Sequence, residues 1–235
     1  MYQNTNQITI AQARQEASTV FLAKVFNWMA IGLGLTGIVA YFTAHTGLAL
    51  AIISSPIFFI LIIGELGLVF YLSARIEKMQ ASTASSLFVG YSVLNGLTLS
   101  VIFLAYTDSS IAGTFFITAG MFGAMAVYGL VTKRDLSGWG SFLFMGLIGI
   151  IIASVVNIFL NNSAMHWMIS MIGVLIFTGL TAYDVQRIKK IGEEGIMTQG
   201  HEAIRKGSIM GALALYLDFI NLFLMLLRFF GGSRD

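Results

Sequence analysis

Seven separate runs of about 20 mostly apolar residues follow one another along the chain, and a helix needs about that many to cross a bilayer. The runs are Phe21–Thr43, Ile52–Ser73, Ala84–Tyr106, Ile111–Val131, Ser141–Leu160, Met165–Tyr183 and Gly207–Leu227. Hydrophobic residues make up 57% of the chain and charged residues only 10%, whereas soluble domains carry about 25% charged residues. The sequence therefore predicts an all-α membrane protein with seven transmembrane helices.

This pattern divides the chain into three parts. Residues 1–20 form a polar N-terminal segment, residues 21–228 the seven-helix transmembrane domain, and residues 229–235 a short C-terminal tail. The N-terminal segment has no basic region ahead of a short apolar core, so it does not read as a cleavable signal peptide. It is expected to be disordered, with a short interfacial helix as the alternative.

The residues present in the chain exclude several classes of function. The net charge of +2 leaves no broad basic surface for nucleic acid. The chain has no cysteine, and His45, His166 and His201 all fall outside or at the rims of the predicted spans, so a buried zinc site lacks ligands. The seventh span holds no lysine that could carry retinal, because Lys206 is only at its edge. We expect no enzymatic activity and no cofactor.

Lysine and arginine lie almost entirely on one side of the predicted membrane. Cytoplasmic loops of membrane proteins carry the basic excess, so the side with more of these residues is assigned to the cytoplasm. That side receives Arg14, Lys24, Arg75, Lys78, Lys133, Arg134, Arg187, Lys189, Lys190, Arg205 and Lys206, and the other only Arg228 and Arg234. The N-terminus is predicted to be cytoplasmic and the C-terminus outside.

The only long polar connection, residues 185–206, lies on the cytoplasmic side. Its glycines at 192, 195 and 200 argue against one rigid helix. We expect a mobile or regulatory loop here.

A few charged residues lie within the spans or at their ends, where ionisable groups usually face the interior and serve function. Glu65 lies in the second span and Asp218 in the seventh, both far from the membrane surfaces by the rise of a helix. Asp184 ends the sixth span and Arg75 closes the second, so both fall near the cytoplasmic edge. This depth estimate separates Asp184 from Asp218 by roughly 10 to 16 Å.

The expected arrangement is a deep acidic layer of Glu65 and Asp218 below a shallower layer in which Arg75 pairs with Asp184. Carboxylates close together in a low dielectric cannot both ionise cheaply and tend to share a proton. Calcium prefers several oxygen ligands, so Glu65 and Asp218 are also candidate metal ligands, and Asn221 could add an amide oxygen. The alternative is structural, with each buried acid hydrogen-bonded between helices. Asn95 and Asn157 are expected to be interhelical hydrogen-bond donors.

Two C-terminal stretches carry a family resemblance. Residues 177–189, FTGLTAYDVQRIK, and residues 212–223, ALALYLDFINLF, resemble the signature of the Bax inhibitor family, also called the transmembrane Bax inhibitor motif family. The resemblance covers essentially all seven spans. The short GGSRD tail lacks the lysine-rich end of the animal members, and this favours the bacterial branch and a bacterial cytoplasmic (inner) membrane.

The resemblance implies seven helices with the last one central, and a pH-sensitive calcium leak. The two aspartates that sense protons in the family match Asp184 and Asp218. By position, the family's latch arginine matches Arg75 and its acidic pore residue matches Glu65. Bacterial members are also linked to restraint of a membrane-anchored protease, so a membrane protease is a candidate partner, beside membrane lipids, calcium and protons.

Two other functions compete with a calcium channel. An intramembrane aspartyl protease would also place aspartates in its sixth and seventh helices. At the second aspartate, such enzymes have the pattern Gly-x-Gly-Asp, whereas this chain has Leu215–Tyr–Leu–Asp218. Their later Pro-Ala-Leu motif is also excluded, because the chain's one proline is Pro56. A non-transporting regulatory protein, acting on a membrane-bound protease or a stress response, is the second alternative. The sequence favours a cation leak gated by the aspartate pair.

Overall fold

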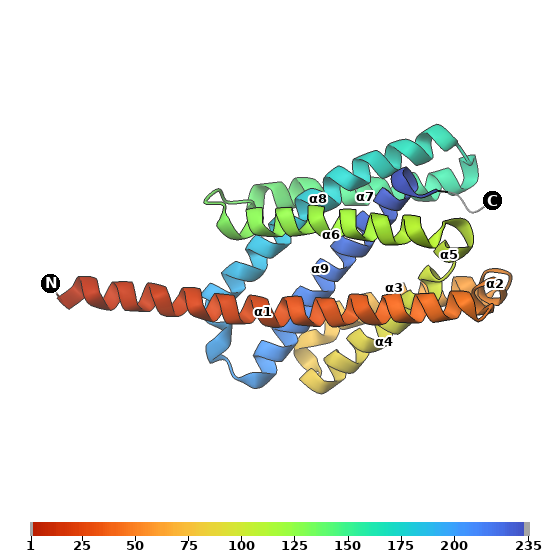
Figure 1. Ribbon diagram of the computed structural model, residues 1–235. Helices are drawn as coiled ribbons and strands as arrows, with labels where there is room; N and C mark the ends of the chain where they lie inside the picture. The colour runs from red at the N-terminus through yellow and green to blue at the C-terminus, as the bar shows by residue number, and fades with distance from the viewer. Residues whose placement is uncertain (1, 233–235) are drawn as a thin grey trace. The chain divides into compact units, whose positions relative to one another are not determined.

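The computed structural model describes residues 2–232, with side chains from residue 12 onward, and this part of the chain is helical with no strand. Figure 1 labels the helices. They are α1 (Tyr2–His45), α2 (Leu48–Ile53), α3 (Ile57–Arg75), η1 (Ile76–Lys78), α4 (Ala81–Leu99), α5 (Ile102–Ala105), α6 (Asp108–Val131), α7 (Ser137–Leu160), α8 (Ser163–Glu193), η2 (Ile196–Thr198) and α9 (His201–Phe230). The prediction of an all-α membrane protein is confirmed.

Seven stretches of the described chain are long and apolar enough to cross a membrane. They are Gln12–His45, Ile57–Lys78, Ala81–Ala105, Asp108–Val131, Ser137–Leu160, Ser163–Glu193 and His201–Phe230. In the most apolar 18 residues of the seventh stretch, 72% of the residues are buried, whereas in those of the second stretch 6% are buried. This burial agrees with the expected inner position of the last helix.

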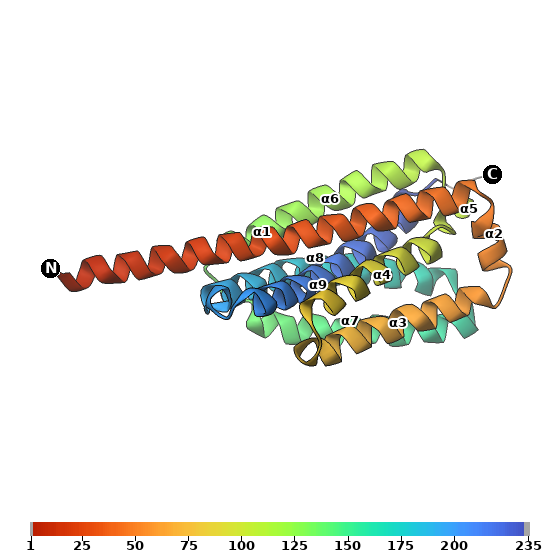
Figure 2. The same ribbon diagram turned by 90° about the horizontal axis from the view of Figure 1, so that it is seen from below.

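The helix ends differ from the sequence prediction at several places, and the third predicted span is divided between α4 and α5. The polar N-terminal segment continues the first span as one helix, α1, which Figure 2 shows as unbroken. The second span begins at Ile57 and not at Ile52, because Pro56 starts a new helix after α2. Most of the expected 185–206 loop is helical, since α8 continues to Glu193 and α9 begins at His201.

The chain divides into two compact units, each described here by itself. The first comprises the residues up to Ala105 together with Ile188–Ala214, and the second comprises Tyr106–Arg187 together with the residues from Leu215 onward. The helices α8 and α9 are therefore each divided between the two units.

In the first unit, α1 packs closely on α4. A side chain at Gly96 would collide with Val39 and with the carbonyl of Thr36, so the two backbones approach closely there. The hydroxyl of Thr36 donates a hydrogen bond to the carbonyl oxygen of Ser92, at 2.8 Å. The helix α3 also contacts α4.

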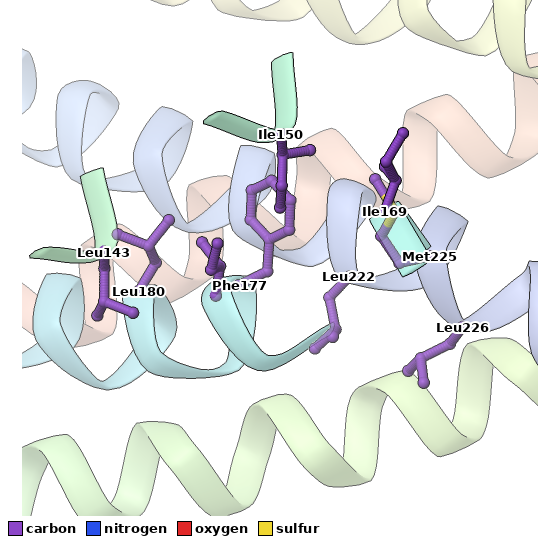
Figure 3. Packing of buried hydrophobic residues seen from close by; sticks show 9 residues of the cluster. Leu143, Ile150, Ile169, Phe177, Leu180, Leu222, Met225 and Leu226 are labelled. Carbon is purple, nitrogen blue, oxygen red and sulfur yellow. The ribbon is translucent and has the colours of Figure 1, made fainter. Parts of the chain in front are cut away.

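The core of the second unit lies between α7, α8 and α9. Figure 3 shows its buried apolar side chains. They are Leu143 and Ile150 of α7, Ile169, Ile176, Phe177 and Leu180 of α8, and Leu222, Met225 and Leu226 of α9. Packing between small and branched side chains holds membrane helices together, because lipid offers no hydrophobic drive. This core fixes the part of α8 before Asp184 against the part of α9 after Asp218.

Candidate functional site

Two buried aspartates face each other in the second unit. Asp184 on α8 is 8% exposed and Asp218 on α9 is 4% exposed. Their side chains hydrogen-bond to each other. Two carboxyl groups can form such a bond only when one of them carries a proton. Their hydrogen bond therefore requires a shared proton, and loss of that proton would leave two negative charges close together.

This contact corrects the depth estimate that separated the two aspartates. The sequence places Asp184 at the end of the sixth span, but α8 continues as a helix to Glu193, nine residues later. At 1.5 Å per residue, Asp184 lies about 14 Å before the end of its helix. The sixth helix is therefore long enough to bring Asp184 beside Asp218.

Arg187 is a charged neighbour of the pair that the sequence analysis missed. Its Nη1 lies 3.4 Å from Oδ1 of Asp184, one turn earlier on α8. The Arg187 side chain is 51% exposed, and its guanidinium carbon lies 6.0 Å from the centre of the Tyr183 ring. The i, i+3 spacing of acid and base on one helix was the available signal. The arginine links the buried pair to the more accessible side of α8.

The helices α6 and α7 position Asp184 through the residues on either side of it. The carbonyl of Ala182 occupies the place where a side chain at Gly129 of α6 would lie, and Gly140 of α7 lies against the ring of Tyr183. A side chain at Gly129 would require a shift of the α8 backbone, and one at Gly140 would require the Tyr183 ring to move. The backbone that carries Asp184 is thereby held from two sides.

Gln186 fixes the same segment of α8 to the connection between α6 and α7. Its Oε1 accepts a hydrogen bond from the backbone N–H of Leu136 at 2.8 Å, and its Nε2 donates to the carbonyl of Arg134 at 2.9 Å. The side chains of Gln186 and Leu136 are buried, so the bond between them is shielded from water, whereas Arg134 is exposed. Gln186 lies within the 177–189 motif, and the sequence analysis predicted no role for it.

Aromatic packing positions Asp218. The ring of the next residue, Phe219, lies 5.3 Å from the Phe115 ring and 5.6 Å from the Phe122 ring, both on α6. Such edge contacts add to the energy of burial. Asn221, the expected amide ligand, donates its Nδ2 to the carbonyl of Leu217 at 2.8 Å. Its role in an ion pathway stays a prediction.

Glu65 forms a separate polar site in the first unit. Its Oε1 accepts a hydrogen bond from the Thr98 hydroxyl at 2.7 Å, and its Oε2 accepts one from Nδ2 of Asn95 at 3.4 Å. Both partners lie on α4, so the expected interhelical role of Asn95 is confirmed. Asn157 has the same role in the second unit, where its Nδ2 lies 3.4 Å from Nδ1 of His166 on α8.

Arg75 is exposed at the C-terminal end of α3, in the first unit. Asp184 belongs to the second unit, so the latch between these two residues stays a prediction, as does the shared layer of Glu65 and Asp218. Within the residues that the structure describes, no three acidic, histidine or cysteine side chains form a group that could hold a metal ion. The aspartate pair alone supplies too few oxygens for tight calcium binding.

Comparison with known proteins places this site in a family. The family model described as "Inhibitor of apoptosis-promoting Bax1" matches residues 18–235. The inner membrane protein YbhL of Escherichia coli (strain K12) is 53% identical over 228 residues, which cover 96% of this chain and 97% of that protein. An uncharacterized protein of Borreliella burgdorferi is 47% identical over 97% of this chain and 99% of its own, and one of Deinococcus radiodurans is 46% identical over 98% and 96%.

Proposed function

The chain belongs to the Bax inhibitor family, and from that premise we propose that it is a multi-pass inner membrane protein that lets calcium or a similar cation pass down its gradient. The leak responds to pH through the pair Asp184 and Asp218. The similarity to YbhL of Escherichia coli, which is named as an inner membrane protein, supports location in the inner membrane. The seven apolar helices support the multi-pass character.

The direct contact of the two aspartates carries this proposal. With one shared proton, the pair forms a hydrogen bond that holds α8 to α9. Without that proton, two like charges in a poorly solvated place repel each other strongly. The pair then separates or recruits a cation. Either response couples the protonation state of one site to the distance between two membrane helices.

Other charged residues take supporting roles in the proposal. Glu65 and Asn221, with Asp218, line the route of the ion, and Arg75 is the latch of the closed state. Glu65 is held by Thr98 and Asn95, which supports a fixed carboxylate that a passing cation can meet. The route is a weak, transient site, because a leak needs ions to leave as readily as they enter.

Calcium entry into liposomes that carry the purified protein tests the proposal. Flux is measured between about pH 6 and pH 8, because the charge of a carboxyl pair that shares a proton depends on pH. We compare the wild type with Asp184→Asn and Asp218→Asn, because asparagine keeps the shape but cannot ionise. Asp135→Asn is the matched control, since Asp135 is an exposed carboxylate of the same unit.

We expect a pH-dependent flux for the wild type and the Asp135→Asn control, and a flat pH profile for the two pair variants. Equal flux for the wild type and Asp218→Asn at every pH would remove the sensor role. No flux above empty liposomes would favour the regulatory alternative, a protein that modulates a membrane-bound protease or a stress response. Pull-down of that partner would then depend on the same aspartates.

The pair also resembles the two carboxyl groups that share a proton in aspartic proteases. We propose that this protein is not an enzyme, and that its substrate is the ion alone. Incubation of the liposomes with a helical peptide substrate checks this. Cleavage that disappears in both Asp184→Asn and Asp218→Asn would overturn the proposal in favour of a protease.

A further inference from the structure

An arginine and a histidine come together in the second unit, where α8 begins and α9 ends, apart from the aspartate pair. Nη1 of Arg228 on α9 donates a hydrogen bond to the hydroxyl of Ser170 on α8, at 3.1 Å. That hydroxyl donates to the carbonyl of His166, also at 3.1 Å, and the charge of Arg228 acts on the His166 ring. Arg228 and His166 are therefore neighbours at one end of this helix pair.

Hydrogen bonds near the connection between α7 and α8 fix which ring nitrogen of His166 carries a proton. Oδ1 of Asn157 accepts a hydrogen bond from the backbone N–H of Asn162, at 3.0 Å, so the Nδ2 group of Asn157 is the part that faces His166. This Nδ2 lies 3.4 Å from Nδ1 of the ring, which must therefore be the acceptor. The proton of the neutral ring is then on Nε2, and the exposed His166 side chain offers an N–H donor.

The positive charge of Arg228 is not neutralised by a carboxylate. Within the residues that the structure describes, its hydrogen-bond partners are the hydroxyl of Ser170 and, at 4.0 Å, the sulfur of Met225, and neither carries a charge. A guanidinium has five N–H donors, so the exposed Arg228 keeps most of its donors for another group. Its planar shape suits a phosphate, which can accept two of these bonds at once.

The site lies at the limits of two apolar runs. The sixth run begins at Met165 and the seventh ends at Leu227, so the histidine and the arginine each lie one residue from the limit of a run. Trp167, which is 55% exposed, packs edge-on against Phe229 with the ring centres 5.7 Å apart. Tryptophan is typical of the interface between membrane and water. The two run limits and the tryptophan place the site at the depth of lipid headgroups.

An exposed apolar face continues from the site along α8. Trp167, Met171 and Leu175 follow at intervals of four residues, which places them on one face of the helix. They are 55%, 42% and 70% exposed. In a membrane span, exposed apolar side chains contact the hydrocarbon chains of lipids. A phospholipid beside this face can therefore have its chains along α8 and its phosphate at Arg228.

From these donors, this charge and this depth, we propose that Arg228 and His166 bind the phosphate of an anionic phospholipid. One phosphate oxygen accepts from the guanidinium of Arg228 and another accepts from Nε2 of His166. The printed contacts of the two side chains include no carboxylate that could pair with an ammonium group. Lipids whose headgroup carries the phosphate charge alone, such as phosphatidylglycerol, are therefore preferred over zwitterionic lipids.

Lipid retention measured by native mass spectrometry tests this proposal. The purified protein is loaded in detergent with phosphatidylglycerol, phosphatidylethanolamine or phosphatidylcholine of identical acyl chains. We expect the wild type to retain phosphatidylglycerol about five-fold better than the other two lipids. This ratio corresponds to about 1 kcal/mol, the attraction of one basic residue to an anionic lipid surface. Equal retention of the three lipids would overturn the proposal.

Arg228→Gln tests the charge of the site. We expect this variant to retain the three lipids equally, because the phosphate loses its cation. Arg134→Gln is the matched control, since Arg134 is an exposed arginine of the same unit, in the connection between α6 and α7. The control is expected to keep the preference for phosphatidylglycerol. A preference that survives in Arg228→Gln, or that disappears equally in Arg134→Gln, would overturn the assignment to Arg228.

A second pair of variants tests His166 with Arg228 in place. His166→Gln and His166→Leu both remove the ring nitrogen that Asn157 contacts, but only glutamine restores an N–H donor near the position of Nε2. We expect His166→Leu to retain about three-fold less phosphatidylglycerol than His166→Gln, because one hydrogen bond contributes about 0.5 to 1.5 kcal/mol. Equal retention by the two variants would overturn the role of His166.

A soluble phosphate ester could offer the same group to the site. Glycerol 3-phosphate in large excess is therefore added to protein loaded with phosphatidylglycerol. We expect the bound lipid to persist, because its hydrocarbon chains add contacts with α8 that the soluble ester lacks. Displacement of the lipid would overturn a membrane lipid as the occupant. These measurements involve no ion flux, so their outcome is independent of the proposed leak.

Discussion

Arg187 places a positive charge beside one member of the buried carboxyl pair, and its removal gives the sharpest prediction at the scale of a residue. A nearby cation favours the ionised form of a carboxyl group, so Arg187→Gln favours the form with the shared proton. We expect the midpoint of the flux against pH profile to move to higher pH by about half a unit, because a half-exposed ion pair contributes under about 1 kcal/mol. Liposome flux between pH 6 and pH 8 measures this shift.

Arg134→Gln is the matched control for that variant. Arg134 is also an exposed arginine of the second unit, and only its backbone carbonyl takes part in the contact with Gln186. An unchanged midpoint in Arg187→Gln, or an equal shift in Arg134→Gln, would mean that the ion pair with Asp184 does not act on the pair. A shift toward lower pH would contradict the electrostatic argument itself.

The two aspartates could be selected from the sequence, but their contact could not. Asp218 stands out because a carboxyl group in an apolar run is rare, and Asp184 because its motif resembles a family signature. Their contact depends on how far α8 continues past Asp184, and the apolar run ends at Tyr183. The hydrocarbon pattern marks where lipid ends and not where the helix ends. Arg187 was missed for the same reason.

Gly129 supplies a prediction at the scale of the helices. A methyl group at this position would collide with the carbonyl of Ala182 on α8, which is backbone and cannot rotate away. We expect Gly129→Ala to destabilise the protein by about 1 to 3 kcal/mol through overpacking, and so to lower its Tm in detergent by about 2 to 4 °C for each kcal/mol.

Gly123→Ala is the control on the same helix. Nothing lies within 4 Å of the added methyl group there, and alanine favours helix over glycine by about 1 kcal/mol. We expect its Tm to be equal to or above that of the wild type. A Tm of Gly129→Ala as high as that of Gly123→Ala would show that α6 and α8 can move apart freely at this point.

Gln186 supplies a second prediction at this scale, for the connection between α6 and α7. Gln186→Leu removes one acceptor and one donor and leaves the N–H of Leu136 and the carbonyl of Arg134 without this partner. A buried polar group that loses its partner costs about 1 to 3 kcal/mol. We expect faster hydrogen exchange at Leu136 and a lower Tm.

Gln199→Leu is the corresponding control, because Gln199 is exposed in the connection before α9. It makes the same change of side chain without loss of a buried partner. We expect wild-type exchange at Leu136 in this variant. Unchanged exchange in Gln186→Leu would mean that the connection is held by other contacts.

Helix existence could be predicted from the sequence far better than helix ends. Each of the seven apolar runs overlaps one candidate membrane span, since backbone groups in lipid must be satisfied within the segment. Outside lipid, water can satisfy the backbone groups, so the apolar pattern does not show where a helix ends. The polar N-terminal segment and residues 185–193 therefore continue as helix, where the sequence predicted disorder and a loop.

At the scale of the whole molecule, an odd number of spans predicts that the two ends of the chain lie on opposite sides of a membrane. Eleven of the 13 lysine and arginine residues fall on the side assigned to the cytoplasm. That orientation stays a prediction, because the helices by themselves have no inside or outside. It decides which side of the membrane Arg187, the exposed neighbour of the aspartate pair, faces.

Single cysteines test the orientation on a clean background, because the chain has no cysteine of its own. Ser163 and Gln199 are both exposed, at the beginning of α8 and just before α9, and α8 crosses the membrane between them. In intact spheroplasts, we expect a membrane-impermeant maleimide to label Ser163→Cys at once and Gln199→Cys only after permeabilisation. The cysteine-free parent is the control for background. The reverse pattern would place Arg187, the charged neighbour of the aspartate pair, on the outer face, and would reverse the direction from which pH acts.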